Sequence, residues 1–308
     1  MEIPPQQFQQ CLDTFLPQVG NYRWIWSLLA FRSRFKEGFP HRIHAIIRRI
    51  TQKKPYFIAH TKEGVAFVGD SREVYSVVCA VHPDWDGPNI RNLLKMYRPK
   101  SGAYLDIGAN MGLLAATMAK SLGDQVPVFA FEPSESTAKL AAATFALNRL
   151  TNVRLFQCAV GEKDETLTFY SSPGNSEWGS FHQTHVEIQF QETPVTCRSL
   201  DSLRQDGTIP KVGLIKIDVE GHEPNVIRGA TEVISKDHPN LTYEYHFTVA
   251  NGIGWSMTDM TELLRPLAHY TYQVQHSDGS LTEFPPPFSH ELINVACYAS
   301  DDPPAPTT

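Results

Sequence analysis

The sequence predicts an α/β fold built on a parallel sheet, and three observations support that prediction. Residues 104–119 (YLDIGANMGLLAATMA) have the pattern of a short apolar strand, a glycine turn and a helix of strong helix formers. A second apolar run, residues 128–131, ends in Glu132 and Pro133. From residue 103 onward, candidate strands alternate with candidate helices, which is typical of parallel strands joined by right-handed crossovers.

The turn between Gly108 and Gly112 predicts a nucleotide-type pocket. Glycine lets a backbone approach a ligand closely, and the N-terminus of the following helix offers unpaired N–H groups. Asn110 stands between the glycines, so the turn lacks the G-x-G-x-x-G pattern, and an NAD(P)-dependent oxidoreductase is disfavoured. Glu132 ends the next strand, where an acid commonly binds ribose hydroxyls. The alternative is that Glu132 is only a solvated charge at a strand end.

The first hundred residues do not fit the sheet pattern. We expect residues 1–55 to form a helical cap or lid, because amphipathic helices usually pack on a core. The alternative is a membrane-surface or partner-binding helix pair, since the segment is aromatic and basic. Residues 56–100 are expected to form an entrance segment. The expected elements are helices at 8–15, 22–31, 41–54 and 88–96 and a hairpin of strands at 56–59 and 65–68.

Residues 101–300 are expected to form the main domain, followed by a disordered tail at 301–308. Ser134 is a typical N-cap for the helix after it, and Pro224 is typical of a first helical turn. The polar stretch 171–185 is expected to be a long loop at the mouth of the substrate site. The expected strands are 153–160, 165–170, 212–219, 241–247, 270–276 and 292–299, with helices at 134–150, 200–204, 224–235 and 257–267.

Five motifs make the prediction specific: LDIGANMG, AFEP, CAVGE, RSLD and IKIDVEGHE, in this order. Between residues 102 and 246 their order and spacing resemble the FkbM family of S-adenosylmethionine-dependent methyltransferases, and residues 216–223 carry the most specific part. The resemblance implies a class I methyltransferase (Rossmann-like) fold, with a seven-stranded, mostly parallel sheet and helices on both faces. Residues 1–55 would be an N-terminal helical extension. The resemblance also implies methyl transfer, usually to a hydroxyl of a sugar or of a polyketide or peptide natural product.

The same resemblance implies which residues contact the methyl donor, S-adenosylmethionine. Acids gathered at the carboxyl ends of the strands suit this donor, because it carries a sulfonium and an ammonium group. The implied donor contacts are Asp106, Gly108, Asn110, Gly112, Glu132, Ser134 and Ala159.

Methylating a hydroxyl also calls for a base, because the acceptor loses a proton. Asp218 is the first candidate, since it ends a strand over the cleft, and His222 is the second, since imidazole titrates near neutral pH. Asp218 could instead bind the donor's ammonium group, and His222 could cap the helix that begins at Pro224. The further candidates are Glu220, His246 and His182, the last of them on the polar loop.

A divalent cation is an alternative means of activating the hydroxyl, because a bound cation lowers the pKa of its ligand. If a cation is bound, Asp218, Glu244 and His246 are the expected ligands, since hard cations prefer oxygen donors. We do not favour the metal, because this spacing is not a strong metal motif.

Composition narrows the function classes. The chain has 308 residues, 42% of them hydrophobic, and a net charge of −6, which argues against a nucleic-acid partner. Five scattered cysteines, with no signal peptide and no transmembrane run, predict a cytoplasmic protein with reduced thiols. We expect a small-molecule acceptor as the partner, and a homodimer through the N-terminal helices. The rival functions are N- or carboxyl methylation and a catalytically silent module that binds a nucleoside.

Overall fold

The computed structural model describes residues 1–22, 26, 47–97, 101–172, 175–181, 191–286 and 292–300. The predictions for His182, for the tail at 301–308 and for most of the helices at 22–31 and 41–54 lie outside these residues. Within the described ranges, no helix combines the length and the apolar character that crossing a bilayer requires.

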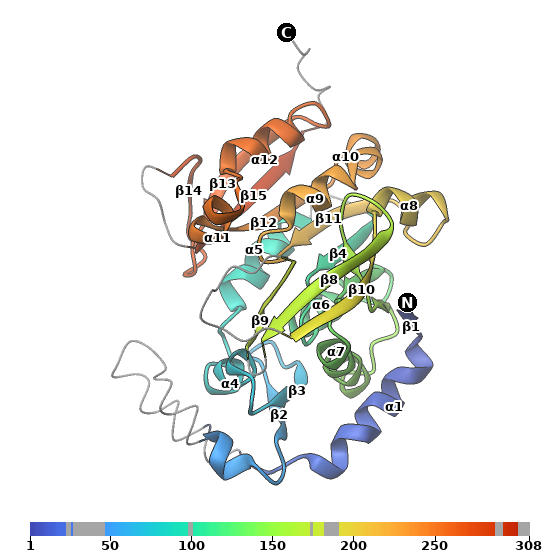
Figure 1. Ribbon diagram of the computed structural model, residues 1–308, viewed down its shortest axis with the longest axis vertical. Helices are drawn as coiled ribbons and strands as arrows, with labels where there is room; N and C mark the ends of the chain where they lie inside the picture. Colours follow the sequence, from blue (N-terminus) through green and yellow to red (C-terminus); the bar gives the residue numbers. More distant parts are fainter. Residues whose placement is uncertain are drawn as a thin grey trace.

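A nine-stranded sheet forms the centre of the molecule (Figure 1). Its five central strands are parallel, and antiparallel pairing begins after them. The chain fills one half of the sheet and then crosses back to fill the other, so the strand order switches beside the strand at 103–107. Across the sheet the strands are β1 (Glu2–Ile3), β6 (Val153–Phe156), β5 (Val128–Phe131), β4 (Ala103–Ile107), β11 (Val212–Ile217), β12 (Asn240–His246), β15 (Leu292–Ala299), β13 (Tyr270–Gln275) and β14 (Leu281–Glu283).

The sheet has nine strands rather than the seven expected, and the two additional strands lie at its edges. At one edge β1 pairs antiparallel with β6, where Glu2 also forms an ion pair with Arg154 at 2.7 Å. At the other edge β14 pairs antiparallel with β13. Strands of two or three residues are too short to show an alternating sequence pattern. Both segments become strands because their backbones pair with an edge of the sheet, and this pairing leaves no pattern in the sequence.

Helices cover both faces of the sheet, as expected (Figure 1). Successive strand residues point to opposite faces: Tyr104 and Leu214 join one buried cluster, and Leu105 and Ile215 join the other. The first face is covered by α5 (Gly87–Tyr97), α6 (Leu113–Leu122) and α7 (Glu135–Leu147). The second face is covered by α8 (Leu200–Gln205), α9 (Glu223–Arg228), α10 (Thr231–Asp237), α11 (Phe247–Ile253) and α12 (Met257–Leu264).

The described parts of the first hundred residues pack on the same face as α6 and α7. Helix α1 (Pro5–Phe15) and the short 3₁₀ helix η1 (Leu16–Gln18) follow β1, and the ring of Phe8 lies 5.5 Å from that of Phe145 on α7. The hairpin of β2 (Tyr56–His60) and β3 (Ala66–Asp70) is present as predicted. Helix α4 (Val74–Val81) after it was not predicted, because its valines favour strands.

A second sheet of four strands stands beside the central one: β7 (Ala159–Val160), β10 (Gln191–Arg198), β8 (Glu165–Ser172) and β9 (Asn175–Ser180). It corrects two predictions. The single strand expected at 153–160 is two strands, β6 and β7, that belong to different sheets. Part of the loop expected at 171–185 is strand β9, which pairs antiparallel with β8. Backbone pairing forms this strand although its sequence is polar.

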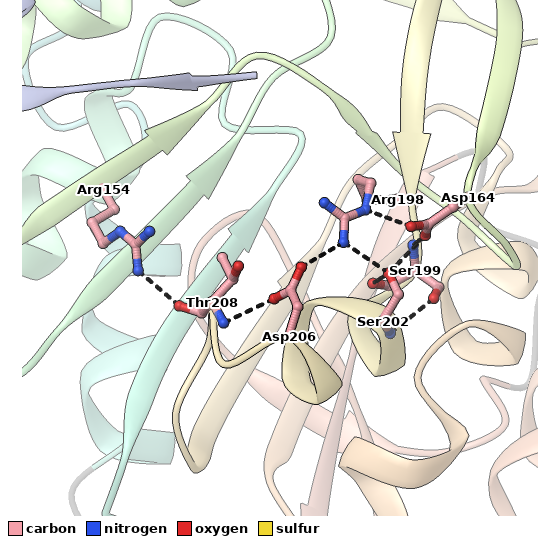
Figure 2. A network of polar contacts seen from close by, with 7 residues as sticks. All are labelled: Arg154, Asp164, Arg198, Ser199, Ser202, Asp206 and Thr208. Carbon is pink, nitrogen blue, oxygen red and sulfur yellow. Dashed lines mark hydrogen bonds and ion pairs between the residues drawn. The ribbon is translucent and has the colours of Figure 1, made fainter.

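A polar network holds the second sheet to the central one (Figure 2). The guanidinium of Arg198 donates to Asp164 at 2.6 Å and to Asp206 at 2.8 Å. Arg154 of β6 donates to the carbonyl oxygen of Thr208 at 2.8 Å, and the backbone N–H of Thr208 donates to Asp206 at 2.9 Å. The RSLD motif that begins at Arg198 therefore stabilises the frame around the site.

Candidate active site

A cavity of about 1160 Å³ lies at the carboxyl ends of β4, β5, β11 and β12. Gly108, Glu132 and Asp218 directly follow the first three of these strands, and Glu244 lies near the end of β12; all four line the cavity. The cavity therefore sits at the switch in strand order, where open α/β sheets bind ligands. Its volume is sufficient for a nucleoside and a second small molecule.

The turn after β4 adopts backbone conformations that explain its residues. Gly108 has a φ of +79°, and a Cβ there would lie 1.8 Å from the carbonyl oxygen of Asp218, so only glycine fits. Asn110 is also left-handed, with a φ of 50°, and its side-chain oxygen accepts a hydrogen bond from Met111 N–H at 2.8 Å. Asparagine tolerates this conformation better than most residues because its side chain can bond locally.

Glu132 connects this turn to the start of the next helix. One carboxylate oxygen accepts from the backbone N–H of Asn110 and the other from that of Ser134, both at 2.9 Å. The side chain is buried but lines the cavity. Burial raises the pKa of Glu132 to about 7, although its two backbone hydrogen bonds act in the opposite direction. Glu132 thus orders the turn and presents a carboxylate to the ligand.

Lys216 is the centre of a buried ionic cluster. Lys216 on β11 stands opposite Asp106 on the neighbouring strand β4. The ammonium nitrogen of Lys216 lies 3.3 Å from a carboxylate oxygen of Asp106 and 3.2 Å from one of Asp218. The same ammonium donates to the carbonyl oxygen of Gly108 at 2.9 Å. Burial alone would lower the pKa of Lys216, but attraction to the two carboxylates outweighs it and the pKa is raised. Asp106 is fully buried and does not line the cavity, so it acts through Lys216.

Three carboxylates meet on the cavity floor. Oxygen atoms of Asp218, Glu220 and Glu244 lie within 4.8 Å of one another. Burial raises the pKa of Glu244 well above its usual value, and repulsion from Asp218 and Glu220 raises it further. Three oxygen donors at this spacing have the chemistry of a hard-cation site. Glu220 takes the place that the sequence suggested for His246, because Nδ1 of His246 accepts from Val249 N–H and caps α11.

The remaining predicted residues lie around the cavity rather than on its wall. His222 is buried against the ring of Phe181, with 4.7 Å between ring centroids, and its Nδ1 hydrogen-bonds to Asn225 at 2.9 Å. Ser134 caps α7 through its hydroxyl, as predicted. A Cβ on Gly112 would lie 2.8 Å from the ring of Phe145, so this glycine lets α6 approach α7. Of the donor contacts implied by sequence, Gly108, Asn110, Glu132 and Ala159 line the cavity; of the base candidates, Asp218, Glu220 and His246 do.

Another part of the lining comes from residues that the sequence did not point to. It is formed by Trp85 and Asp86 before α5, by Asn89 near the start of α5, and by Gln275 at the end of β13. Asp86 accepts a hydrogen bond from the hydroxyl of Tyr75, and Gln275 donates one to Asn89 at 3.0 Å. The DWD sequence at 84–86 was the one available signal, since an aromatic residue between two acids is suited to ligand binding.

The family model of the methyltransferase FkbM domain matches residues 106–274, which is more than half of the chain. The chain belongs to the FkbM methyltransferase family. The FkbM segment begins just before the turn that follows β4, and it contains Glu132, Lys216 and the carboxylate cluster. Together with the sheet order, this membership gives the chain the class I methyltransferase fold that was expected. The wall built by Asp86 and Gln275 lies outside the FkbM segment.

Several characterised methyltransferases are similar to the chain. Methyltransferase 1 of Beauveria bassiana is 32% identical over 148 residues, covering 42% of this chain and 59% of the relative. The 2-O-methyltransferase NoeI of Sinorhizobium fredii is 28% identical over 159 residues, covering 47% and 64%. The hexuronic acid methyltransferase AglP of Haloferax volcanii is 28% identical over 129 residues, covering 42% and 50%. The chain thus matches less than two thirds of the length of each relative.

Proposed function

We propose that the protein is an S-adenosylmethionine-dependent methyltransferase that methylates a hydroxyl group of a small molecule. The observation that carries the proposal is the shared cavity: the FkbM turn at Gly108 and Asn110, the acid Glu132 and the carboxylate cluster all face it. Membership of the FkbM family supports methyl transfer. A relative whose name specifies 2-O-methylation supports an oxygen acceptor over a nitrogen or carboxyl acceptor.

The donor would occupy the side of the cavity lined by Gly108, Asn110, Glu132 and Ala159. Glu132 would accept hydrogen bonds from the ribose hydroxyls, which is the usual role of an acid at this strand end. Asp218 lies across the turn from Glu132, and its negative charge would attract the donor's cationic groups. Glycine at 108 keeps the backbone low enough for the ligand to pass over it.

The reaction would be an in-line displacement that needs the acceptor oxygen close to the methyl carbon and opposite the sulfur. The carbon–sulfur bond breaks with its electrons passing to sulfur, the oxygen–carbon bond forms, and the hydroxyl proton goes to a carboxylate. Glu244 would accept this proton. Its pKa is raised by burial and by neighbouring carboxylates, which makes it a stronger base than an ordinary glutamate. Asp218 is the weaker candidate because Lys216 holds it in an ion pair.

Calorimetric titration tests the proposal. S-adenosylmethionine, S-adenosylhomocysteine and NADH are titrated into wild type, Glu132→Ala and the matched control Glu135→Ala, whose side chain is an exposed helical partner of Lys139. We expect wild type and the control to bind both sulfur nucleosides and not NADH, and Glu132→Ala to lose them. If folded wild type binds neither sulfur nucleoside, the methyltransferase proposal fails, and a silent binding module becomes the better account.

The carboxylate cluster could bind a divalent cation, and the same protein preparation tests whether methyl transfer needs one. Lys216 already neutralises part of the charge at Asp218, so the site needs no cation to be stable. We therefore expect methyl transfer to continue in the presence of EDTA and to be unaffected by added Mg²⁺. Loss of activity in EDTA that Mg²⁺ restores would instead assign Asp218, Glu220 and Glu244 to a metal ion.

A further inference from the structure

Gln275 carries a buried hydrogen-bond acceptor that has no partner among the described residues. The side chain is only 2% exposed, and it lines the cavity at the end of β13. Its Nε2 donates to Asn89, which fixes the orientation of the amide, whereas its Oε1 accepts no hydrogen bond from any described residue. Buried polar atoms are nearly always paired, so an orphan on a cavity wall points to a ligand that donates a hydrogen bond there.

Two carboxylates that line the same cavity also accept hydrogen bonds. Asp86 accepts from Tyr75, and Asp278 accepts from the backbone N–H of Ser280 at 2.8 Å. Neither carboxylate forms an ion pair with a lysine or arginine among the described residues. A ligand against this wall must therefore supply the hydrogens, as a polyhydroxylated molecule does.

The charge of the whole cavity supports the same conclusion. Asp84 forms ion pairs with Lys62 and Arg91, which neutralise its charge, so it is left out of the charge count of the cavity. Within the described lining, Lys216 is the one side chain with a permanent positive charge, and Asp106 and Asp218 already hold it. The carboxylates of the lining outnumber this one permanent cation, so an acidic acceptor would be less favourable there than a neutral or cationic one. Apart from Asp84, the carboxylates that line the cavity are Asp86, Glu132, Asp218, Glu220, Glu244 and Asp278.

Trp85 adds an apolar surface next to these acceptors. It lines the cavity while its side chain is 55% exposed, and its ring lies 6.1 Å from that of His82. An indole at the rim offers a flat apolar face with low conformational cost. A sugar ring has both complementary features, since its C–H groups can lie on an aromatic face while its hydroxyls donate hydrogen bonds.

We propose that Trp85, Asp86 and Gln275 form an acceptor subsite for a polyhydroxylated sugar unit that is neutral or carries an amino group, and that the subsite rejects a uronic acid. This inference rests on the proposed methyl transfer and adds the substrate class. It also separates this protein from the relative named for hexuronic acid, with which it shares part of its sequence.

The test measures initial rates of methyl transfer from saturating S-adenosylmethionine to methyl glycosides of hexoses, of 2-amino hexoses and of hexuronic acids. We expect turnover of neutral or amino glycosides and at least about tenfold lower kcat/KM for the matching uronic acids. A uronic acid as the best acceptor would overturn the proposal. So would the absence of turnover for every sugar by enzyme that binds S-adenosylmethionine, while leaving the methyltransferase proposal standing.

Variants at Gln275 make the residue assignment falsifiable. Gln275→Ala should raise the acceptor KM about tenfold or more, with donor affinity unchanged, because only the acceptor contacts this wall. Gln275→Glu keeps an acceptor oxygen and should retain binding of an amino glycoside. The control is Gln273→Ala on the same strand, which does not line the cavity. Thermal unfolding checks that each variant is folded. An unchanged acceptor KM in folded Gln275→Ala would remove Gln275 from the subsite.

Discussion

The proposed donor wall, with Gly108, Asn110, Glu132 and Ala159, and the proposed acceptor wall, with Trp85, Asp86 and Gln275, are assembled in different ways. The donor wall comes from consecutive strands and turns of one stretch of chain, all within the FkbM segment. The acceptor wall joins Trp85 and Asp86, which precede the FkbM segment, to Gln275, the residue that directly follows its end at 274. A locally encoded wall suits a common donor, whereas a wall built from distant segments can vary with the acceptor.

The largest expected effect is at Glu244, the proposed base, which lines the cavity beside Asp218 and Glu220. Glu244→Gln should lower kcat by about 10²–10⁴-fold, because it removes the base that accepts the hydroxyl proton. Binding of S-adenosylhomocysteine should be unchanged, since the donor wall is intact. The control is Glu283→Gln on the exposed strand β14, which should keep full activity. A folded Glu244→Gln enzyme with nearly normal kcat would move the base elsewhere.

A smaller but still large effect is expected at Gly108, in the turn after β4, and the comparison is Gly123 at the end of α6. Gly108→Ala and Gly123→Ala both place a side chain at a left-handed position, with φ of +79° and +82°. The new methyl group meets the Asp218 carbonyl at position 108 and nothing within 4 Å at position 123. Gly108→Ala should therefore cost about 2–4 kcal/mol of unfolding free energy and Gly123→Ala markedly less. Urea unfolding measures both, and equal costs would contradict the close approach at Gly108.

A variant at Arg198 tests whether the polar network between the two sheets can be weakened without changing either wall of the cavity. Arg198→Ala removes two ion pairs from the network in Figure 2. We expect a loss of about 1–2 kcal/mol of unfolding free energy, because these partners are partly solvated. Donor affinity should be unchanged in the folded protein. Arg49→Ala, an exposed arginine, is the control. A selective loss of donor binding in Arg198→Ala would mean that the RSLD motif belongs to the donor wall.

A further expected effect is a pH dependence of stability that comes from a buried acid, Glu223, which does not line the cavity. Burial raises the pKa of Glu223 from 4.5 to about 7. Between these values the folded state holds a proton that the unfolded state releases, so stability from this group is complete below the lower value and is lost as pH rises through the higher one. Glu223→Gln should therefore lose less stability than wild type between about pH 5 and about pH 8.

Urea unfolding across that range measures this effect, and the exposed variant Glu135→Gln serves as its control. A Glu223→Gln protein whose stability follows the wild-type pH profile would show that the proton is not held in the folded state.

The sequence predicted the turn after β4 and the acid that faces it because one motif contains this geometry. A strand, a left-handed turn and an acid after the next strand are local features, so Gly108, Asn110 and Glu132 could be identified without a structure. The role of Lys216 was not predictable in the same way. Its ion pair with Asp106 depends on the register between β11 and β4, which the sequence of either strand does not specify.

The acceptor wall escaped prediction for a different physical reason. A glutamine at the end of a strand has the same local pattern whether its amide is solvated, buried or facing a cavity. The contact between Gln275 and Asn89, two residues far apart in the chain, orients the amide, and its Oε1 then has no partner among the described residues. His222 illustrates the opposite error: its chemistry suggested a base, but packing against Phe181 keeps it off the cavity wall.

The most direct test of this account measures the binding of both ligands, donor and acceptor, in one variant of each wall. Affinity for S-adenosylhomocysteine and the acceptor KM are measured on folded Glu132→Ala and Gln275→Ala, the latter with donor at saturation. We predict that donor affinity falls only in Glu132→Ala and that Gln275→Ala changes only the acceptor KM. If Gln275→Ala loses donor affinity as severely as Glu132→Ala, the cavity is not divided into a donor wall and an acceptor wall.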